Sequence, residues 1–165
     1  MSSKKTIKIN PDFFRTGKKT KKKRERKEKP IFTPSLRPNN IKKQLLQRIK
    51  HYIPHIYRGK QFHSINERLR FLKYETDDNF NRHMDACYSD ESNNISSMIT
   101  ILIYLNENYE GANTTFFTNS NDNKGFSLVP KIGMVCLMDQ DIQHEVPQLL
   151  NGIKYALRTE LMYEN

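Results

Sequence analysis

Two histidines and one aspartate have the residue types and the spacing of a metal site. His83 and Asp85 lie two residues apart, and His144 follows Asp85 by 59 residues. On an extended strand, residues i and i+2 point to the same face, so His83 and Asp85 could bind the same metal ion. His144 comes after the apolar run 133–138, which predicts a second strand beside the first. Two imidazoles and one carboxylate can hold Fe(II) and leave positions open for other ligands. The alternative is that His83 and Asp85 are an exposed polar pair at the end of a strand.

Two basic residues follow His144 in a segment that predicts another strand. Lys154 lies ten residues past this histidine, at the start of the apolar and aromatic stretch 153–163. Lys154, Ala156 and Arg158 alternate onto one face of that strand. A buried cation on the metal-bearing face needs an anion, and a dicarboxylate co-substrate would supply one. Arg158 offers a carboxylate the better bidentate geometry, so both cations are candidate anchors.

Around these residues, from about Asn66 to Tyr163, the sequence resembles the iron(II)/2-oxoglutarate dioxygenases, and specifically their prolyl 4-hydroxylase-like branch. The resemblance rests on pieces that stand in the family's order. Beside the metal trio they are a strand over 66–74, a tyrosine nine residues before the first metal histidine, a core strand over 98–106, a hairpin at 110–117 and a Pro-x-x-Gly turn at 130–133. The hairpin carries Ala112 where the family usually has a second glycine.

The resemblance implies the cofactors, the reaction and the roles of four further residues. Fe(II) would be bound by the trio, 2-oxoglutarate would be the co-substrate, and ascorbate would serve as a reductant. The far carboxylate of the co-substrate would pair with Lys154, which has the family's spacing, or with Arg158, assisted by Tyr74 and Thr100. The implied reaction is hydroxylation of a C–H bond in a prolyl or other side chain of a protein or peptide, with decarboxylation of 2-oxoglutarate to succinate.

The pattern of short β-type segments predicts a mainly β fold. Eight short strands with turn residues between them suit a double-stranded β-helix, or jelly roll, which the resemblance also implies. One or two N-terminal helices are expected, and the one that begins near residue 39 has an apolar stripe that we expect to pack against a sheet. The expected domain, 39–165, is short for this fold, so N-terminal strands could be missing. The expected strands are 69–75, 82–88, 96–106, 114–118, 126–129, 133–138, 144–146 and 153–163.

The positive charge is concentrated at the N-terminus. The chain has 165 residues and a net charge of +10, and residues 1–50 hold 18 of the 28 Lys and Arg residues with only 3 acidic ones. Such a run repels itself and buries little, so we expect residues 1–38 to form a disordered arm. Residues 4–29 could contact nucleic acid or another polyanion through phosphates, carry a nuclear-import address, or be a solvated tail.

Two other functions stay open, and the composition predicts a compartment. A degenerate jelly roll with a polyanion-binding arm would be a binding module and no enzyme, and a dioxygenase acting on a nucleobase would use the arm to reach its substrate. The sequence shows no secretory signal and no apolar run of about 18 residues. We therefore expect an intracellular protein, cytoplasmic or nuclear. The basic leader also resembles leaders of giant DNA virus proteins, while the high Asn, Lys and Ile usage fits any AT-rich genome equally well.

Overall fold

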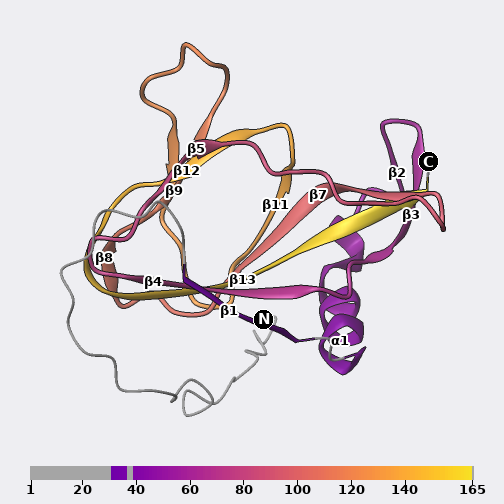
Figure 1. Cartoon of the computed structure of the whole chain (residues 1–165), viewed down its shortest axis with the longest axis horizontal. Coiled ribbons are helices and arrows are strands. Elements are labelled where there is room, and N and C mark those ends of the chain that lie inside the picture. Colours follow the sequence, from indigo (N-terminus) through magenta and orange to yellow (C-terminus); the bar gives the residue numbers. More distant parts are fainter. Residues whose placement is uncertain (1–30, 37–38, 165) are drawn as a thin grey trace, which may run out of the picture.

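Two β-sheets form a double-stranded β-helix in the structure, a computed structural model that describes residues 31–36 and 39–164. The larger sheet has the strand order β1-β4-β13-β3-β2, with β7 also on β13, β6 and β11 on β7, and β8 on the start of β13. The smaller sheet has the order β10-β9-β12-β5 and lies over one end of the larger one (Figure 1). The strands are β1 (Ile31–Leu36), β2 (Ile56–Tyr57), β3 (Lys60–Ile65), β4 (Leu69–Glu75), β5 (Phe80–His83), β6 (Ser89–Asp90), β7 (Ile95–Tyr104), β8 (Tyr109–Gly111), β9 (Thr114–Phe117), β10 (Phe126–Leu128), β11 (Val135–Asp139), β12 (Gln143–Val146) and β13 (Leu149–Glu164).

The long strand β13 organises the larger sheet. Its register with β4 places Lys154 opposite Tyr74 and Arg158 opposite Arg70. Because side chains alternate along a strand, Lys154, Ala156, Arg158 and Glu160 share one face of β13. This face is turned toward the smaller sheet, since the cavity between the sheets is lined by Arg158 together with residues of β5 and β12. The expected alternation of Lys154, Ala156 and Arg158 is therefore confirmed.

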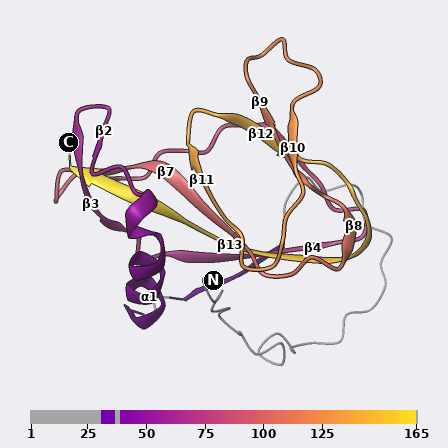
Figure 2. The ribbon, with the colours of Figure 1, turned by 180° about the vertical axis from the view of Figure 1, so that it is seen from behind.

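Helix α1 (Asn39–Ile49) packs against the opposite side of the larger sheet. Its buried residues Leu45 and Ile49 join a core with Ile101 and Leu161, so the expected apolar stripe is confirmed. A short 3-10 helix, η2 (Lys50–Tyr52), follows α1. Figure 2 shows α1 at the end of β13 that is remote from the smaller sheet. None of the helices in the described ranges has the length and apolar character needed to cross a membrane.

The structure corrects three sequence-based boundaries. The segment 31–36, expected in the arm, forms β1 and pairs with β4, while 1–30, 37 and 38 lie outside the described residues. A hairpin of β2 and β3 lies over residues 56–65, where no strand was expected from the sequence. The strand expected over 82–88 ends at His83, because the backbone N–H of Asp85 turns to the carbonyl of Gln140 in the loop before β12.

The loop between β9 and β10 extends away from both sheets in Figures 1 and 2. Asp122 holds its turn by accepting hydrogen bonds from the backbone N–H groups of Thr118, Lys124 and Gly125. Arg82, the neighbour of His83 on β5, donates to the carbonyl oxygens of Asn119 and Asp122, and its guanidinium lies 3.8 Å from the centroid of the Phe117 ring. The loop is thus fixed to the strand that carries the first histidine of the trio.

Candidate metal centre

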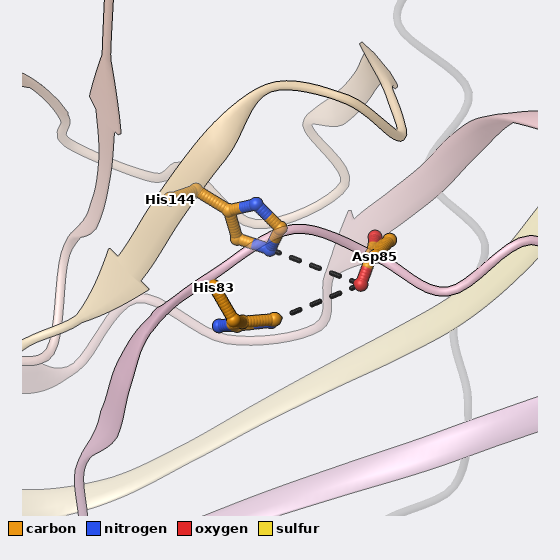
Figure 3. A group of neighbouring side chains, drawn as sticks. All are labelled: His83, Asp85 and His144. Carbon is orange, nitrogen blue, oxygen red and sulfur yellow. Dashed lines mark ion pairs between the residues drawn. The ribbon is translucent and has the colours of Figure 1, made fainter. Parts of the chain in front are cut away.

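His83, Asp85 and His144 converge in the structure, as the sequence predicts. Their ligand atoms all lie within 4.8 Å of one another. The Nε2 atoms of His83 and His144 are 3.8 Å and 4.0 Å from Oδ1 of Asp85 (Figure 3). The two histidines come from adjacent strands, because β5 pairs with β12 and sets His83 opposite His144. One carboxylate and two imidazoles facing a common point are the donor set for a divalent transition metal.

Both imidazoles are oriented so that their Nε2 atoms can bind a cation. Nδ1 of His83 lies 2.7 Å from the carbonyl oxygen of Asn81, and Nδ1 of His144 lies 3.0 Å from that of Ile142. A carbonyl only accepts, so each Nδ1 carries the proton and each Nε2 presents a lone pair toward Asp85. Burial lowers the pKa of His144, which further favours the neutral imidazole that a metal requires. The residues present therefore fit an iron site.

Asp85 is buried and held through both of its oxygens. Oδ2 accepts a hydrogen bond of 2.6 Å from the hydroxyl of Thr100, a fully buried residue of β7. Oδ1, the oxygen that faces both histidines, lies 3.0 Å from Nη2 of Arg158. These contacts fix the plane of the carboxylate. Since Oδ2 is engaged by Thr100, Asp85 is set to bind a metal through Oδ1 alone, which would leave more positions open.

A cavity of about 130 Å³ opens beside the three ligands. Both sheets contribute to its walls, and most of the lining is apolar. Its charged and polar lining residues outside the trio are two arginines, one tyrosine and one threonine. The lining consists of Arg70, Leu72, Tyr74, Phe80, His83, Asp85, Leu102, Thr114, Met138, His144, Val146 and Arg158.

Lys154 is a buried cation without a carboxylate partner among the residues that the structure describes. Only 1% of its surface is exposed, and Nζ donates a hydrogen bond of 2.6 Å to the carbonyl oxygen of Ala112. Nζ also lies 5.1 Å and 5.6 Å from the ring centroids of Tyr74 and Tyr104. Burial lowers the pKa of Lys154 to about 7. The lysine does not itself line the cavity, but Tyr74 does, and Tyr104 donates to the lining residue Thr114.

Ala112 stands in an unusual backbone conformation next to this lysine. Its φ is +50°, in the left-handed region that glycine adopts most easily, and its side chain is fully buried. The preceding Gly111 has a φ of +81°, and a Cβ there would lie 2.5 Å from the carbonyl oxygen of Gln148. The hairpin therefore keeps the glycine-like shape that the resemblance implies, although one of its two positions is an alanine.

Sequence reasoning identified the metal trio, Lys154, Arg158 and Tyr74, and the structure brings all of them to one region. Thr100 lies in the same region, but its hydroxyl contacts Asp85 and the residue is not part of the cavity lining. The cavity residues Arg70 and Thr114 were missed as functional residues. Arg70 could have been found from the alternation of β4, because it lies two positions from Leu72 and four from Tyr74 on the same face.

Comparisons with known proteins agree with this geometry. A family model described as the 2OG-Fe(II) oxygenase superfamily matches residues 69–159. No curated protein matches. Among solved structures, the viral collagen prolyl hydroxylase of Paramecium bursaria Chlorella virus-1 has a TM-score of 0.58 and 14% identity, with 80% of this chain and 78% of that one covered.

Two further solved structures are longer than this chain. A prolyl hydroxylase from Trichoplax adhaerens, in complex with a hypoxia inducible factor peptide fragment, has a TM-score of 0.55 and 17% identity, with 72% of this chain and 53% of that one covered. An oxidoreductase of the 2OG-Fe(II) oxygenase family from Burkholderia pseudomallei has a TM-score of 0.50 and 15% identity, covering 64% and 45%. The chain thus spans about half the length of these two proteins. At these identities the likeness shows the fold.

Proposed function

We propose that this chain, which belongs to the 2OG-Fe(II) oxygenase superfamily, is a dioxygenase that hydroxylates a C–H bond in a protein or peptide, with proline as the first candidate side chain. The observation that carries the proposal is the convergence of His83, Asp85 and His144 beside a cavity. Family membership brings Fe(II) and 2-oxoglutarate. The trio would hold the metal, and the apolar walls would limit the access of water to it.

Bound Fe(II) would supply the activation of O2, with one oxygen atom entering succinate and the other entering the substrate as CO2 is released. The contribution of the chain is orientation and charge. Thr100 and Arg158 hold the carboxylate of Asp85, and the carbonyls of Asn81 and Ile142 hold the two imidazoles. Because these contacts fix the three donor atoms toward one point, the atoms would need little rearrangement to bind a metal.

We assign the far carboxylate of 2-oxoglutarate to Lys154 in this proposal. A buried ammonium that contacts only a carbonyl oxygen and two aromatic rings would gain most from an anion. Arg158 is the weaker candidate, because its Nη2 already lies beside the carboxylates of Asp85 and Glu160. Tyr74 and Thr114, which line the cavity near Lys154, are placed to contact the co-substrate.

A peptide substrate is the finer part of the proposal. The structurally similar protein from Trichoplax adhaerens is a prolyl hydroxylase in complex with a peptide fragment. In this chain the side chain of Met84, between His83 and Asp85, is 55% exposed, and Phe126 at the base of the β9–β10 loop is 68% exposed. Large exposed apolar side chains next to a site offer contacts to an extended peptide.

The test is a turnover assay with Fe(II), 2-oxoglutarate and O2. We expect the wild-type protein to form succinate, faster with proline-containing peptides than with the same peptides carrying alanine. We expect hydroxylated peptide to gain one oxygen atom by mass spectrometry. Asp85→Ala should abolish both signals, while Glu110→Ala, a change at an exposed carboxylate of β8, should leave them intact. Succinate formation by Asp85→Ala at the wild-type rate would refute the proposal.

The basic N-terminal segment carries a separate proposal about partners. Residues 4–29 lie outside the described residues, and their charge is the only support for contact with a polyanion. Binding of nucleic acid through Lys and Arg releases counterions, so it should weaken steeply with salt. A mobility-shift titration of the full chain and of a chain starting at Ile31, at two salt concentrations, tests this contact.

A further inference from the structure

Two arginines stand directly opposite each other on the floor of the cavity. Arg70 of β4 and Arg158 of β13 are paired in the strand register, and both line the cavity. Like charges directly opposite each other on neighbouring strands destabilise a sheet. Glu160 supplies the missing counter-charge: its Oε1 contacts Nη1 of Arg70 and lies 3.6 Å from Nη2 of Arg158.

Glu160 is itself firmly held. Only 1% of its surface is exposed, and its Oε2 accepts a hydrogen bond of 2.9 Å from the side-chain amide of Asn66. With two arginines and an amide around it, this carboxylate is compensated despite its burial. It does not line the cavity and forms no hydrogen bond or ion pair with His83, Asp85 or His144, so the proposed reaction gives it no direct role.

The link to the metal centre is one nitrogen atom. Nη2 of Arg158 lies 3.0 Å from Oδ1 of Asp85 and 3.6 Å from Oε1 of Glu160, so two carboxylates share it. Oδ1 is also the oxygen that faces both histidines. A guanidinium at that oxygen competes with a divalent cation for the same negative charge, and the strength of this competition depends on what else binds the guanidinium.

We propose that Glu160 is a positioning residue for the metal centre, which shares the guanidinium of Arg158 with Asp85 and so weakens the hold of Arg158 on Oδ1, leaving that oxygen available to a divalent cation. Removing the charge of Glu160 has two effects of the same sign. Arg158 would turn its full charge to Asp85, and the uncompensated positive charge of Arg70 and Arg158 would repel the cation. Both weaken metal binding. This inference rests on the proposed function, because it takes the three ligands as a metal site.

The alternative assignment of Arg158 predicts a different behaviour. If Arg158 were the anchor of the co-substrate, neutralising Glu160 would free the guanidinium for 2-oxoglutarate and tighten co-substrate binding, with little change in metal affinity. If Arg70, Arg158 and Glu160 had only a structural role, the loss of Glu160 would lower thermal stability. Its effect on metal affinity would then be the same with and without Arg158. Metal affinity, measured with and without Arg158, separates these cases.

The experiment is a titration of the full chain with Co(II), followed by its visible absorption, without 2-oxoglutarate or O2. The variants are Glu160→Gln, Arg158→Met and the double variant. Glu164→Gln, an exposed carboxylate at the end of the same strand, is the matched control. Direct outer contacts of metal ligands typically change affinity by 10–100-fold, and Glu160 acts one contact further out through Arg158, so we expect Glu160→Gln to raise the Co(II) Kd by roughly tenfold. In the Arg158→Met background only the repulsion from Arg70 remains, so the same change should alter the Kd by less than about threefold.

Three results would overturn the inference. They are wild-type affinity in Glu160→Gln, an equal loss of affinity in both backgrounds, and tighter 2-oxoglutarate binding by Glu160→Gln at unchanged metal affinity. If Glu160→Gln does not fold, Arg70→Met carries the test. That change leaves Glu160 wholly to Arg158, so Co(II) binding should be unchanged or tighter, and weaker binding would refute the inference.

The same titration distinguishes failure of this inference from failure of the proposed function. Asp85→Ala is titrated alongside the other variants. Wild-type protein that binds no Co(II), or binds it equally well without Asp85, would remove the metal site and the proposed function with it. Wild-type protein that binds Co(II) through Asp85 and is indifferent to Glu160 would leave the function standing and refute only the role of Glu160.

Discussion

Lys154 should make binding of 2-oxoglutarate depend on pH in a range where most lysines are fully charged. Burial lowers its pKa from 10.5 to about 7, and only 1% of its surface is exposed. At about 1.4 kcal/mol per pKa unit, this shift means that burial disfavours the ammonium by roughly 5 kcal/mol relative to the neutral amine. A carboxylate that pairs with the ammonium restores the charged state, so binding above pH 7 must take up a proton.

The sign and size of the effect follow from this linkage. Below pH 7 the lysine is already protonated, and the Kd of 2-oxoglutarate should be nearly constant. Above pH 7 the free protein is increasingly neutral at Lys154, so the Kd should rise about fivefold between pH 7 and 8 and about tenfold more by pH 9. The histidine of β12 does not interfere in this window, because burial lowers the pKa of His144 and keeps it neutral.

Isothermal titration of the metal-loaded protein with 2-oxoglutarate, without O2, measures the Kd and the number of protons taken up on binding. In buffers of different ionisation enthalpy we expect uptake of about half a proton at pH 7 and about 0.9 at pH 8. Lys154→Arg, whose guanidinium stays charged, should lose the pH dependence. Lys131→Met, a change at an exposed lysine, should keep it. A wild-type Kd that is flat from pH 7 to 9, without proton uptake, would show that Lys154 does not anchor the co-substrate.

Three other changes test separate parts of the structure. Gly111→Ala places a Cβ 2.5 Å from a backbone oxygen and should cost about 1–3 kcal/mol of unfolding free energy, whereas Gly59→Ala, with a similar φ and nothing within 4 Å, should cost less in a denaturant titration. Thr100→Val removes a donor to the metal-binding carboxylate and should weaken Co(II) binding by roughly tenfold. Its 2-oxoglutarate Kd at saturating metal should not change, and a large change would instead support the co-substrate role that the sequence suggested. Deleting residues 1–30 should leave succinate formation intact and reduce salt-sensitive polyanion binding, and lost turnover in a folded truncation would contradict this division of the chain.

The metal trio could be predicted because its information is local. His83 and Asp85 are two residues apart, and one apolar strand before His144 is enough to suggest that it folds back. The surroundings of Asp85 could not be predicted in this way. Its contacts to Thr100 and Arg158 come from β7 and β13, and they depend on strand register, which the residue pattern of each strand alone does not give.

The fold class could be predicted from the sequence, but several strands and their bounds could not. Strands with a strong apolar pattern, such as β4 and β7, were expected near their observed bounds. The segment 31–36 contains Pro34 and follows a basic run, so it was assigned to the arm, although it pairs with β4 as an edge strand, where proline is tolerated. The hairpin of β2 and β3 was missed. Its turn residues, Arg58 and Gly59, both have positive φ in the structure, and only the glycine signals this in the sequence.

Two cations four residues apart on β13 show why a site has to be read from its partners. Lys154 and Arg158 share a face, and the sequence leaves both as anchors for an anion. In the structure, Arg158 lies against the carboxylates of Asp85 and Glu160, whereas Lys154 contacts a carbonyl oxygen and two tyrosine rings. A cation already compensated by acids gains little from another anion, while a buried and uncompensated one gains much. In our proposals the same strand therefore carries two tasks: Arg158 and Glu160 would set the charge around the metal, and Lys154 would remain for a ligand that brings its own negative charge.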